Sequence, residues 1–222
     1  MKTKIEKLSL GEILRVSMNK GEEIFAQPGA LISAKGEIEV ESKVGNLASS
    51  FMRAFAGGES LFQTRIKAVD DNVEVEIGTA VPSELIKIEL DGAMLLGDGA
   101  YLAHTGDIDV SAKWGGLNSL VAGSGLLFLY AKGKGDLYLA GGEAILSKEL
   151  KEGEFMYLDN TSFLAVPEGT KMEKKWIGKG LMSKVFSGEG FMFKIYGPTT
   201  VIYQTEAPSA LARAIARYLR LR

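Results

Sequence analysis

Short runs of alternating apolar and polar residues recur along the chain. The pattern is clearest in "NVEVEIG" (72–78), "IKIEL" (86–90) and "DLYLA" (136–140), and it returns in "EIEVE" (37–41) and "DIDV" (107–110). Successive side chains of a β-strand point to opposite faces, so a period of two predicts strands with one buried and one solvated face. Such strands are typical of antiparallel sheets, and turn-forming pairs such as Asp91-Gly92 separate the runs. The sequence therefore predicts an all-β protein.

Similar segments recur in the same order along the chain. Gly58, Gly123 and Gly188 each open an apolar run and stand 65 residues apart. Upstream of them, 37–44, 107–114 and 169–176 align, with Lys43, Lys113 and Lys175 in one column and Val44, Trp114 and Trp176 in the next. A fixed period indicates a repeat architecture. We therefore predict one compact unit over 1–206, built from three tandem β repeats at about 18–80, 87–150 and 151–205.

The last residues differ in character from the repeats. In 207–222, Leu211, Ile215 and Leu219 lie at helical spacing, and Arg213, Arg217 and Arg220 lie away from that stripe; the segment holds four arginines and no acidic residue. This pattern predicts a basic amphipathic C-terminal helix. We expect its alanine-rich stripe to dock on a protein surface. Attachment to an anionic membrane is the alternative, since basic amphipathic helices bind such surfaces.

Composition narrows the classes of protein. The formal charge of the 222 residues is −2, which counts against nucleic acid as a general partner. The chain has no cysteine, which excludes disulfides and thiolate zinc sites. Because no signal-peptide pattern and no run of eighteen apolar residues is found, we expect a cytoplasmic protein.

Residues that could carry chemistry are few. His104 is the one histidine, so a catalytic triad would need it, and we interpret it as a surface or turn residue. The carboxylates of "EIEVE" and "NVEVE" fall on predicted wet faces of strands, and we interpret Trp114 and Trp176 as structural. The segment "KMEKKW" (171–176) sets basic residues beside an aromatic, which is a weak nucleic-acid signal. We assign no catalytic, cofactor-binding or metal-binding residue and expect no enzyme and no cofactor.

The order of several short motifs resembles the family named for altered inheritance of mitochondria, type 24. The motifs span roughly 18–206, and any one of them is weak alone; among them are Gln27-Pro28-Gly29, Gly99-Ala100-Tyr101, Gly153-Glu154, Gly197-Pro198 and Gln204-Thr205. The resemblance implies three tandem β-sandwich-like units, each similar to the subunit of the tryptophan-RNA-binding attenuation protein. It also implies assembly as a homotrimeric ring.

Shared fold does not establish a shared ligand. We therefore expect a non-enzymatic, ring-like scaffold or binding protein whose partner is a second copy of itself. The alternative is a ring that binds a small ligand or RNA between its β repeats. The tail at 207–222 adds a protein or a peripheral membrane as a further expected partner.

Overall fold

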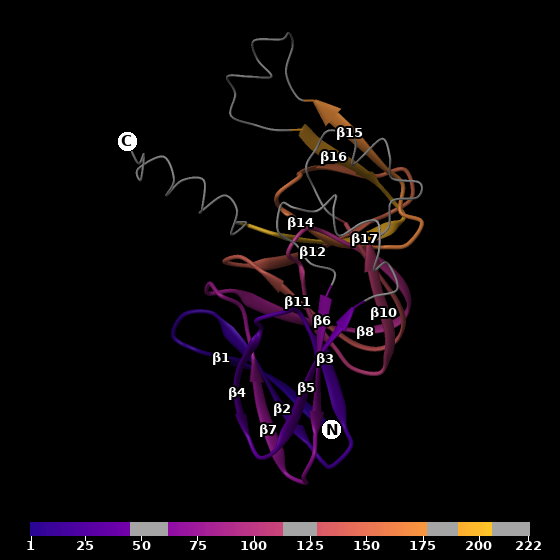
Figure 1. The fold of residues 1–222 in the computed structure, drawn as a ribbon. Coiled ribbons are helices and arrows are strands. Elements are labelled where there is room, and N and C mark those ends of the chain that lie inside the picture. The colour runs from indigo at the N-terminus through magenta and orange to yellow at the C-terminus, as the bar shows by residue number, and fades with distance from the viewer. Residues whose placement is uncertain (45–61, 113–127, 177–190, 206–222) are drawn as a thin grey trace, which may run out of the picture.

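The protein is built from antiparallel strands (Figure 1). The computed structural model describes residues 1–44, 62–112, 128–176 and 191–205, and this part contains no helix. The strands are β1 (Lys2–Lys7), β2 (Glu12–Met18), β3 (Glu23–Ala26), β4 (Leu31–Lys35), β5 (Ile38–Val44), β6 (Phe62–Ala68), β7 (Val73–Ile77), β8 (Glu84–Leu96), β9 (Tyr101–His104), β10 (Asp107–Ala112), β11 (Leu129–Gly141), β12 (Ile145–Leu150), β13 (Phe155–Asp159), β14 (Phe163–Pro167), β15 (Met172–Trp176), β16 (Phe191–Tyr196) and β17 (Thr199–Gln204). The all-β prediction is confirmed.

Several sequence predictions fall outside the described residues. They are the helix at 207–222, the three glycine-led segments at 58, 123 and 188, and the side chains of Trp114 and Trp176. The division into three superposable repeats stays a prediction.

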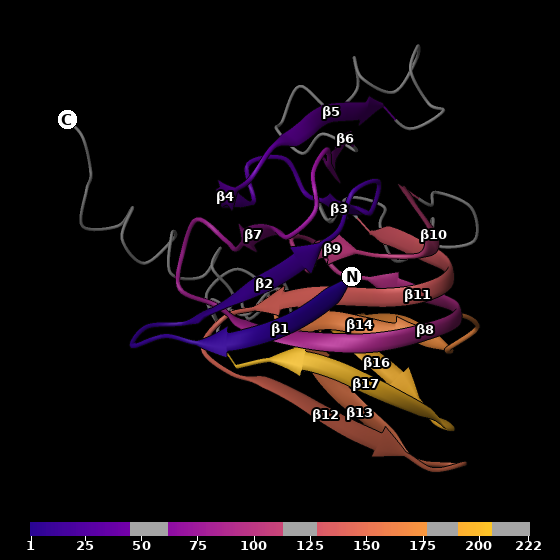
Figure 2. The ribbon, with the colours of Figure 1, turned by 90° about the horizontal axis from the view of Figure 1, so that it is seen from below.

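The strands form three sheets in the described part of the chain. Sheet A has the order β1-β2-β7-β4, and sheet C has the order β13-β16-β15. The ten-stranded sheet B lies between them, in the order β12-β17-β14-β8-β11-β9-β3-β6-β5, with β10 added beside β11. Figure 2 shows β12, β17, β14, β8 and β11 running next to one another across this sheet. Figure 1 shows sheet A at the lower end of the molecule and β15 and β16 of sheet C at the upper end.

Strands β8 and β11 form the centre of sheet B. They pair without interruption over 13 residues each, from Glu84↔Gly141 to Leu96↔Leu129. Two residues beyond their midpoint Gly92 faces Gly133, and both have positive φ, +134° and +139°. Positive φ in this range is tolerated by glycine because it lacks a Cβ atom. The two glycines therefore allow both long strands to change direction together without losing their pairing.

The first hydrophobic core lies between sheet A and sheet B. Alternate residues of β2 and β7 point inward, and the core is completed from β3, β6, β9 and β11; its largest fully buried members include Leu14, Met18, Ile24, Ile66, Ile77, Leu102 and Tyr138. The hydroxyl of Tyr138 donates a hydrogen bond to Thr3 Oγ1 at 2.7 Å, which ties β1 to the centre of sheet B. Burying each such apolar side chain contributes about 1.5–3 kcal/mol to stability.

The second hydrophobic core lies under sheet C and is rich in aromatic residues. Phe191, Phe193 and Ile195 alternate along β16 and face Phe163 and Val201 of sheet B. The rings of Phe163 and Phe193 meet edge to face, with centroids 5.6 Å apart, which is a favoured arrangement for aromatic pairs.

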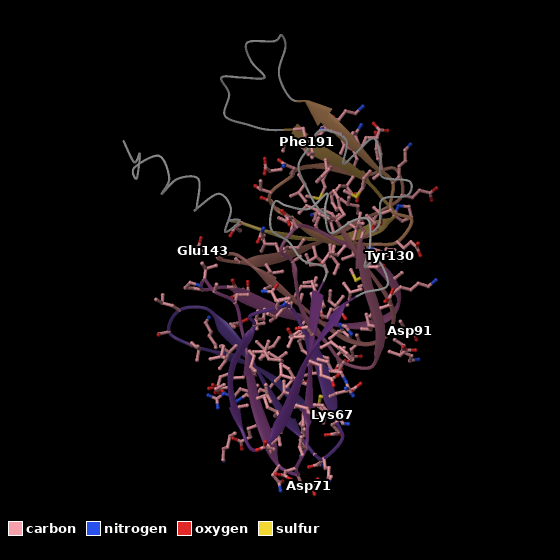
Figure 3. The ribbon with its side chains drawn as sticks, in the orientation of Figure 1. Lys67, Asp71, Asp91, Tyr130, Glu143 and Phe191 are labelled. Carbon is pink, nitrogen blue, oxygen red and sulfur yellow. The ribbon has the colours of Figure 1, made fainter. Side chains whose placement is uncertain are left out.

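Figure 3 shows Phe191 near the upper end of the molecule and Asp71 at the lower end, on the turn before β7. A third core of aliphatic residues lies around β8 and β11.

Candidate assembly edges and an aromatic face

Three tight turns of the chain each contain a backbone hydrogen bond of the same type, from an amide to the carbonyl three residues earlier. The amide of Ala30 donates to the carbonyl of Gln27 at 3.2 Å, and the amide of Ala100 donates to the carbonyl of Gly97 at 3.2 Å. The third bond, from Ser162 to Asp159, measures 3.1 Å. The three turns directly precede β4, β9 and β14, respectively. Aligning the turns on this bond makes the residues of these three strands correspond one to one.

The strands after these turns share an irregularity. In β4 the register against β7 shifts between Leu31 and Ser33, which places Ile32 on a β-bulge. Leu164 holds the same place in β14, where the register against β17 shifts between Phe163 and Ala165. In β9 the register against β11 shifts at the same place, around Leu102. A bulge turns the local backbone and redirects its groups, so it often marks a specialised contact.

The first junction in sheet B joins β3 to β9. The amide of Gln27 donates to the carbonyl of the bulge residue Leu102 at 2.8 Å. Beside this bond, Ala26 lies opposite Ala103 and Phe25 lies opposite His104. These contacts carry the sheet from one end of the molecule into its centre.

The second junction in sheet B joins β8 to β14 in the same way. The amide of Gly97 donates to the carbonyl of the bulge residue Leu164 at 2.7 Å. Leu96 lies opposite Ala165, and Leu95 lies opposite Val166. The two junctions therefore match in their leading hydrogen bond, in the bulge that accepts it and in strand direction.

Each junction joins a strand that ends at a tight turn to a strand that carries a bulge. One further strand of each kind, β13 and β4, has no such partner within the described residues. Strand β4 ends the order of sheet A, and β13 ends the order of sheet C, so neither has a neighbour on its outer side within the described residues. The side chain of Ile32 is 56% exposed, whereas its counterparts Leu102 and Leu164 are 0% and 1% exposed. On β13, Phe155 and Tyr157 are 50% and 45% exposed. Strands β1, β5, β12 and β15 also end a sheet in the described part of the chain, but β4 and β13 are the ones that match a half of the two junctions, and we call these two strands the open edges.

His104 belongs to the first junction. It was predicted at the surface or in a turn, and this is wrong, since its side chain is 1% exposed in β9. Its ring stacks on Phe25 with centroids 5.0 Å apart, and its Nδ1 lies 2.8 Å from the hydroxyl of Tyr101. Burial raises the pKa of Tyr101 because an ionised phenolate would lose its hydration. The covering strand β3 lies about 80 residues earlier in the chain, so the local pattern carried no sign of it.

The outer face of sheet C gathers aromatic rings and lysines. Lys194 Nζ lies 3.9 Å from the ring centroid of Phe155 and 4.7 Å from that of Tyr196, and it also lies over the ring of Tyr157 at 5.8 Å. Lys171 Nζ is 4.8 Å from the ring centroid of Tyr196. An ammonium group over an aromatic face is held by the ring's negative electrostatic potential. We call Phe155, Tyr157, Lys171, Lys194 and Tyr196 the aromatic–lysine face.

Several charged side chains elsewhere form ion pairs, both within one strand and between strands. Lys175 lies 2.8 Å from Glu173 and holds the pKa of that carboxyl below its usual value. Arg65 binds Glu23 of β3 and Glu41 of β5, and these bonds raise its own pKa. The glutamates of β5 and β7 point outward, as predicted, with Glu74 exposed and Glu76 half-buried.

No metal-binding cluster of histidine and carboxylate side chains is found among the described residues. In the same part of the chain, no helix is long and apolar enough to cross a membrane.

Comparison with known proteins gives one family and one fold. The family model described as mitochondrial biogenesis AIM24 matches residues 5–206. A crystal structure of a protein from Streptococcus pyogenes superposes with a TM-score of 0.79 at 21% sequence identity, covering 98% of this chain and 99% of that one. At this identity the similarity establishes the fold alone. No curated protein matches the chain.

Proposed function

The chain belongs to the AIM24 family, and we propose that it is a non-enzymatic scaffold that assembles with copies of itself into a ring. The observation that carries this proposal is the pair of open edges, β4 and β13. Unpaired strand edges expose backbone groups that readily accept another strand, and proteins normally cover or block them. Here each open edge has counterparts that are paired inside the same chain.

The junction chemistry supports a structural role over a catalytic one. The single histidine of the chain is buried between Phe25 and Tyr101, where its ring serves contact between two strands. A general base must reach the proton that it removes, and a ring enclosed in this way offers no such approach. Other side chains at the two junctions, such as Leu96, Leu102 and Ala165, are apolar and buried.

Assembly is tested by the mass of the protein in solution. We expect light scattering at micromolar concentration to give about three times the chain mass of 23.9 kDa, the stoichiometry implied by the family resemblance. Replacing the exposed Ile32 by aspartate should give monomers that remain folded, because a charge would be desolvated in the contact.

The matched control is Val40→Asp, which places the same charge on another half-exposed apolar residue, on β5. It should leave the mass unchanged. Wild-type protein that scatters as a monomer would refute the assembly.

A second candidate function is binding of single-stranded RNA, and the aromatic–lysine face favours it. Lysines combined with exposed rings are the chemistry of stacking platforms for single strands, where each stacked base contributes about 1–3 kcal/mol. Fluorescence anisotropy with a labelled oligoribonucleotide tests this at several salt concentrations. Lys194→Ala should weaken binding, whereas Lys148→Ala, on the exposed side of β12, should not. Absence of binding at low salt would remove this candidate.

A further inference from the structure

We propose that β13 of one copy pairs antiparallel with β4 of a second copy in one defined register. Leu158 lies opposite Ser33 of the second copy, and Tyr157 lies opposite its Ala34. The inference rests on the proposed assembly and specifies its interface. The occupant of each open edge is therefore the other open edge of an identical chain.

The register follows from the shared turn bond. Gln27, Gly97 and Asp159 each accept that bond, so they correspond to one another. At both internal junctions, the amide of this residue also donates to the carbonyl of a bulge residue in the next strand. By the same rule the amide of Asp159 donates to the carbonyl of Ile32, which is the one bulge residue of the three without such a donor among the described residues.

The neighbouring pairs follow from the two internal junctions. Ala26 and Leu96 precede the residues that donate, and they lie opposite Ala103 and Ala165. One step before the donor in β13 stands Leu158, and one step after the bulge in β4 stands Ser33. The next pair outward, Phe25 opposite His104 in the first junction, corresponds to Tyr157 opposite Ala34.

Burial agrees with this register. The residues corresponding to Ile32 and Ser33 are among the most buried in the protein: Leu102, Ala103, Leu164 and Ala165 are each at most 1% exposed. In the single chain Ile32 is 56% exposed, and Ser33 is also exposed. We expect an added β13 strand to remove Ile32 from water, because its counterparts Leu102 and Leu164 are buried at the places where β3 and β8 pair beside them.

The two open edges lie on different strands, so the contact is head to tail. Figure 1 shows β4 at the lower end of the molecule and β16, the strand that pairs with β13, at the upper end. A head-to-tail contact repeats until a ring closes or a filament grows. Two copies joined through the same edge, β4 to β4, would instead stop at a dimer. Pairing of β13 with β4 therefore predicts a ring or a filament, whereas pairing of β4 with β4 predicts a dimer.

Cysteine cross-linking tests the register, because the natural chain has no cysteine. The variant carries Ala34→Cys and Tyr157→Cys, both at exposed positions. Facing residues of antiparallel strands have Cα atoms about 4.5–5.5 Å apart, within the range that a disulfide spans. Copper–phenanthroline with oxygen takes two electrons and two protons from each pair of thiols, leaving one S–S bond.

We expect bands at multiples of the chain mass on a non-reducing gel, and their loss on reduction. Each single variant alone should give no ladder, and a mixture of the two single variants should give dimers of one of each. A control with Tyr157→Cys and Ser42→Cys, on the edge of β5, should not cross-link. Dimers formed by Ala34→Cys alone would overturn the head-to-tail direction.

Light scattering of the reduced variants separates this inference from the assembly itself. If wild-type protein assembles and the Ala34/Tyr157 pair stays uncrosslinked within an intact assembly, the register is wrong and the assembly stands. If the variant with Ala34→Cys and Tyr157→Cys becomes monomeric while the control with Tyr157→Cys and Ser42→Cys stays assembled, Ala34 lies in the interface. Monomeric wild-type protein overturns both.

Discussion

The glycine pair near the centre of β8 and β11 permits a test with an internal control. Gly92 and Gly133 face each other and have nearly equal φ, +134° and +139°. A Cβ atom on Gly92 would meet nothing within 4 Å, whereas one on Gly133 would overlap the carbonyl oxygen of Asp107 in β10. Alanine at each site therefore imposes the same backbone strain, and only one of them adds a collision with a neighbouring strand.

The magnitudes follow from these two terms. Backbone strain at a position of this kind costs about 1–3 kcal/mol, so Gly92→Ala should lower the free energy of unfolding by that amount. Overpacking against a fixed backbone costs about 1–3 kcal/mol more, which applies to Gly133→Ala alone. For a chain of this size, each 1 kcal/mol lowers the midpoint of thermal unfolding by roughly 2–4 °C.

The assay is urea unfolding followed by far-ultraviolet circular dichroism, with all variants at one protein concentration because assembly would add to stability. Gly133→Ala should be the less stable variant, with a slope against urea close to that of Gly92→Ala. Equal losses in the two variants would refute the reasoning, since the collision with β10 would then contribute nothing.

Two further predictions concern buried polar groups. Gln204 accepts a hydrogen bond from the amide of Gly142 and donates one to the carbonyl of Thr161, so Gln204→Ala should cost about 1–3 kcal/mol of unfolding free energy, measured in urea. Burial raises the pKa of Tyr101 in the folded state, while unfolded tyrosine ionises near pH 10, so stability should be complete below about pH 10 and fall above it by about 1.4 kcal/mol per pH unit. Tyr101→Phe should make that fall shallower in urea titrations on both sides of pH 10, and an unchanged slope would contradict the assignment.

The alternation of residues predicted individual strands well where one face is open to water. In β7, Val73, Val75 and Ile77 are buried and Glu74 is exposed, as the period of two requires. The same reading was wrong for "DLYLA", where Leu137 to Ala140 are all buried. Strand β11 is central and has layers on both faces, and an alternating pattern cannot report a layer supplied by distant residues.

The open edges could be recognised only in three dimensions. The motifs Gln27-Pro28-Gly29 and Gly99-Ala100-Tyr101 were visible in the sequence, and two of the tight turns and their bulges lie in or beside them. Which strand joins which was not visible, because Phe25 and His104 are far apart in the chain and pair through the backbone. Backbone pairing depends little on side-chain identity, so it leaves a weak trace in a single sequence.

The uninterrupted pairing of β8 with β11 also has a consequence for how the molecule comes apart. Every other strand of sheet B connects to the rest through this pair of strands, on one side by β14 and on the other by β9 and β10. Detaching either flank therefore exposes an edge of β8 or of β11 to water. Native-state hydrogen exchange should therefore find the slowest amides in β8 and β11, with both flanks opening at lower free energy. A fragment of residues 1–83 would keep β3 but lack β9, its partner in the first junction. We expect this fragment to show no cooperative unfolding transition.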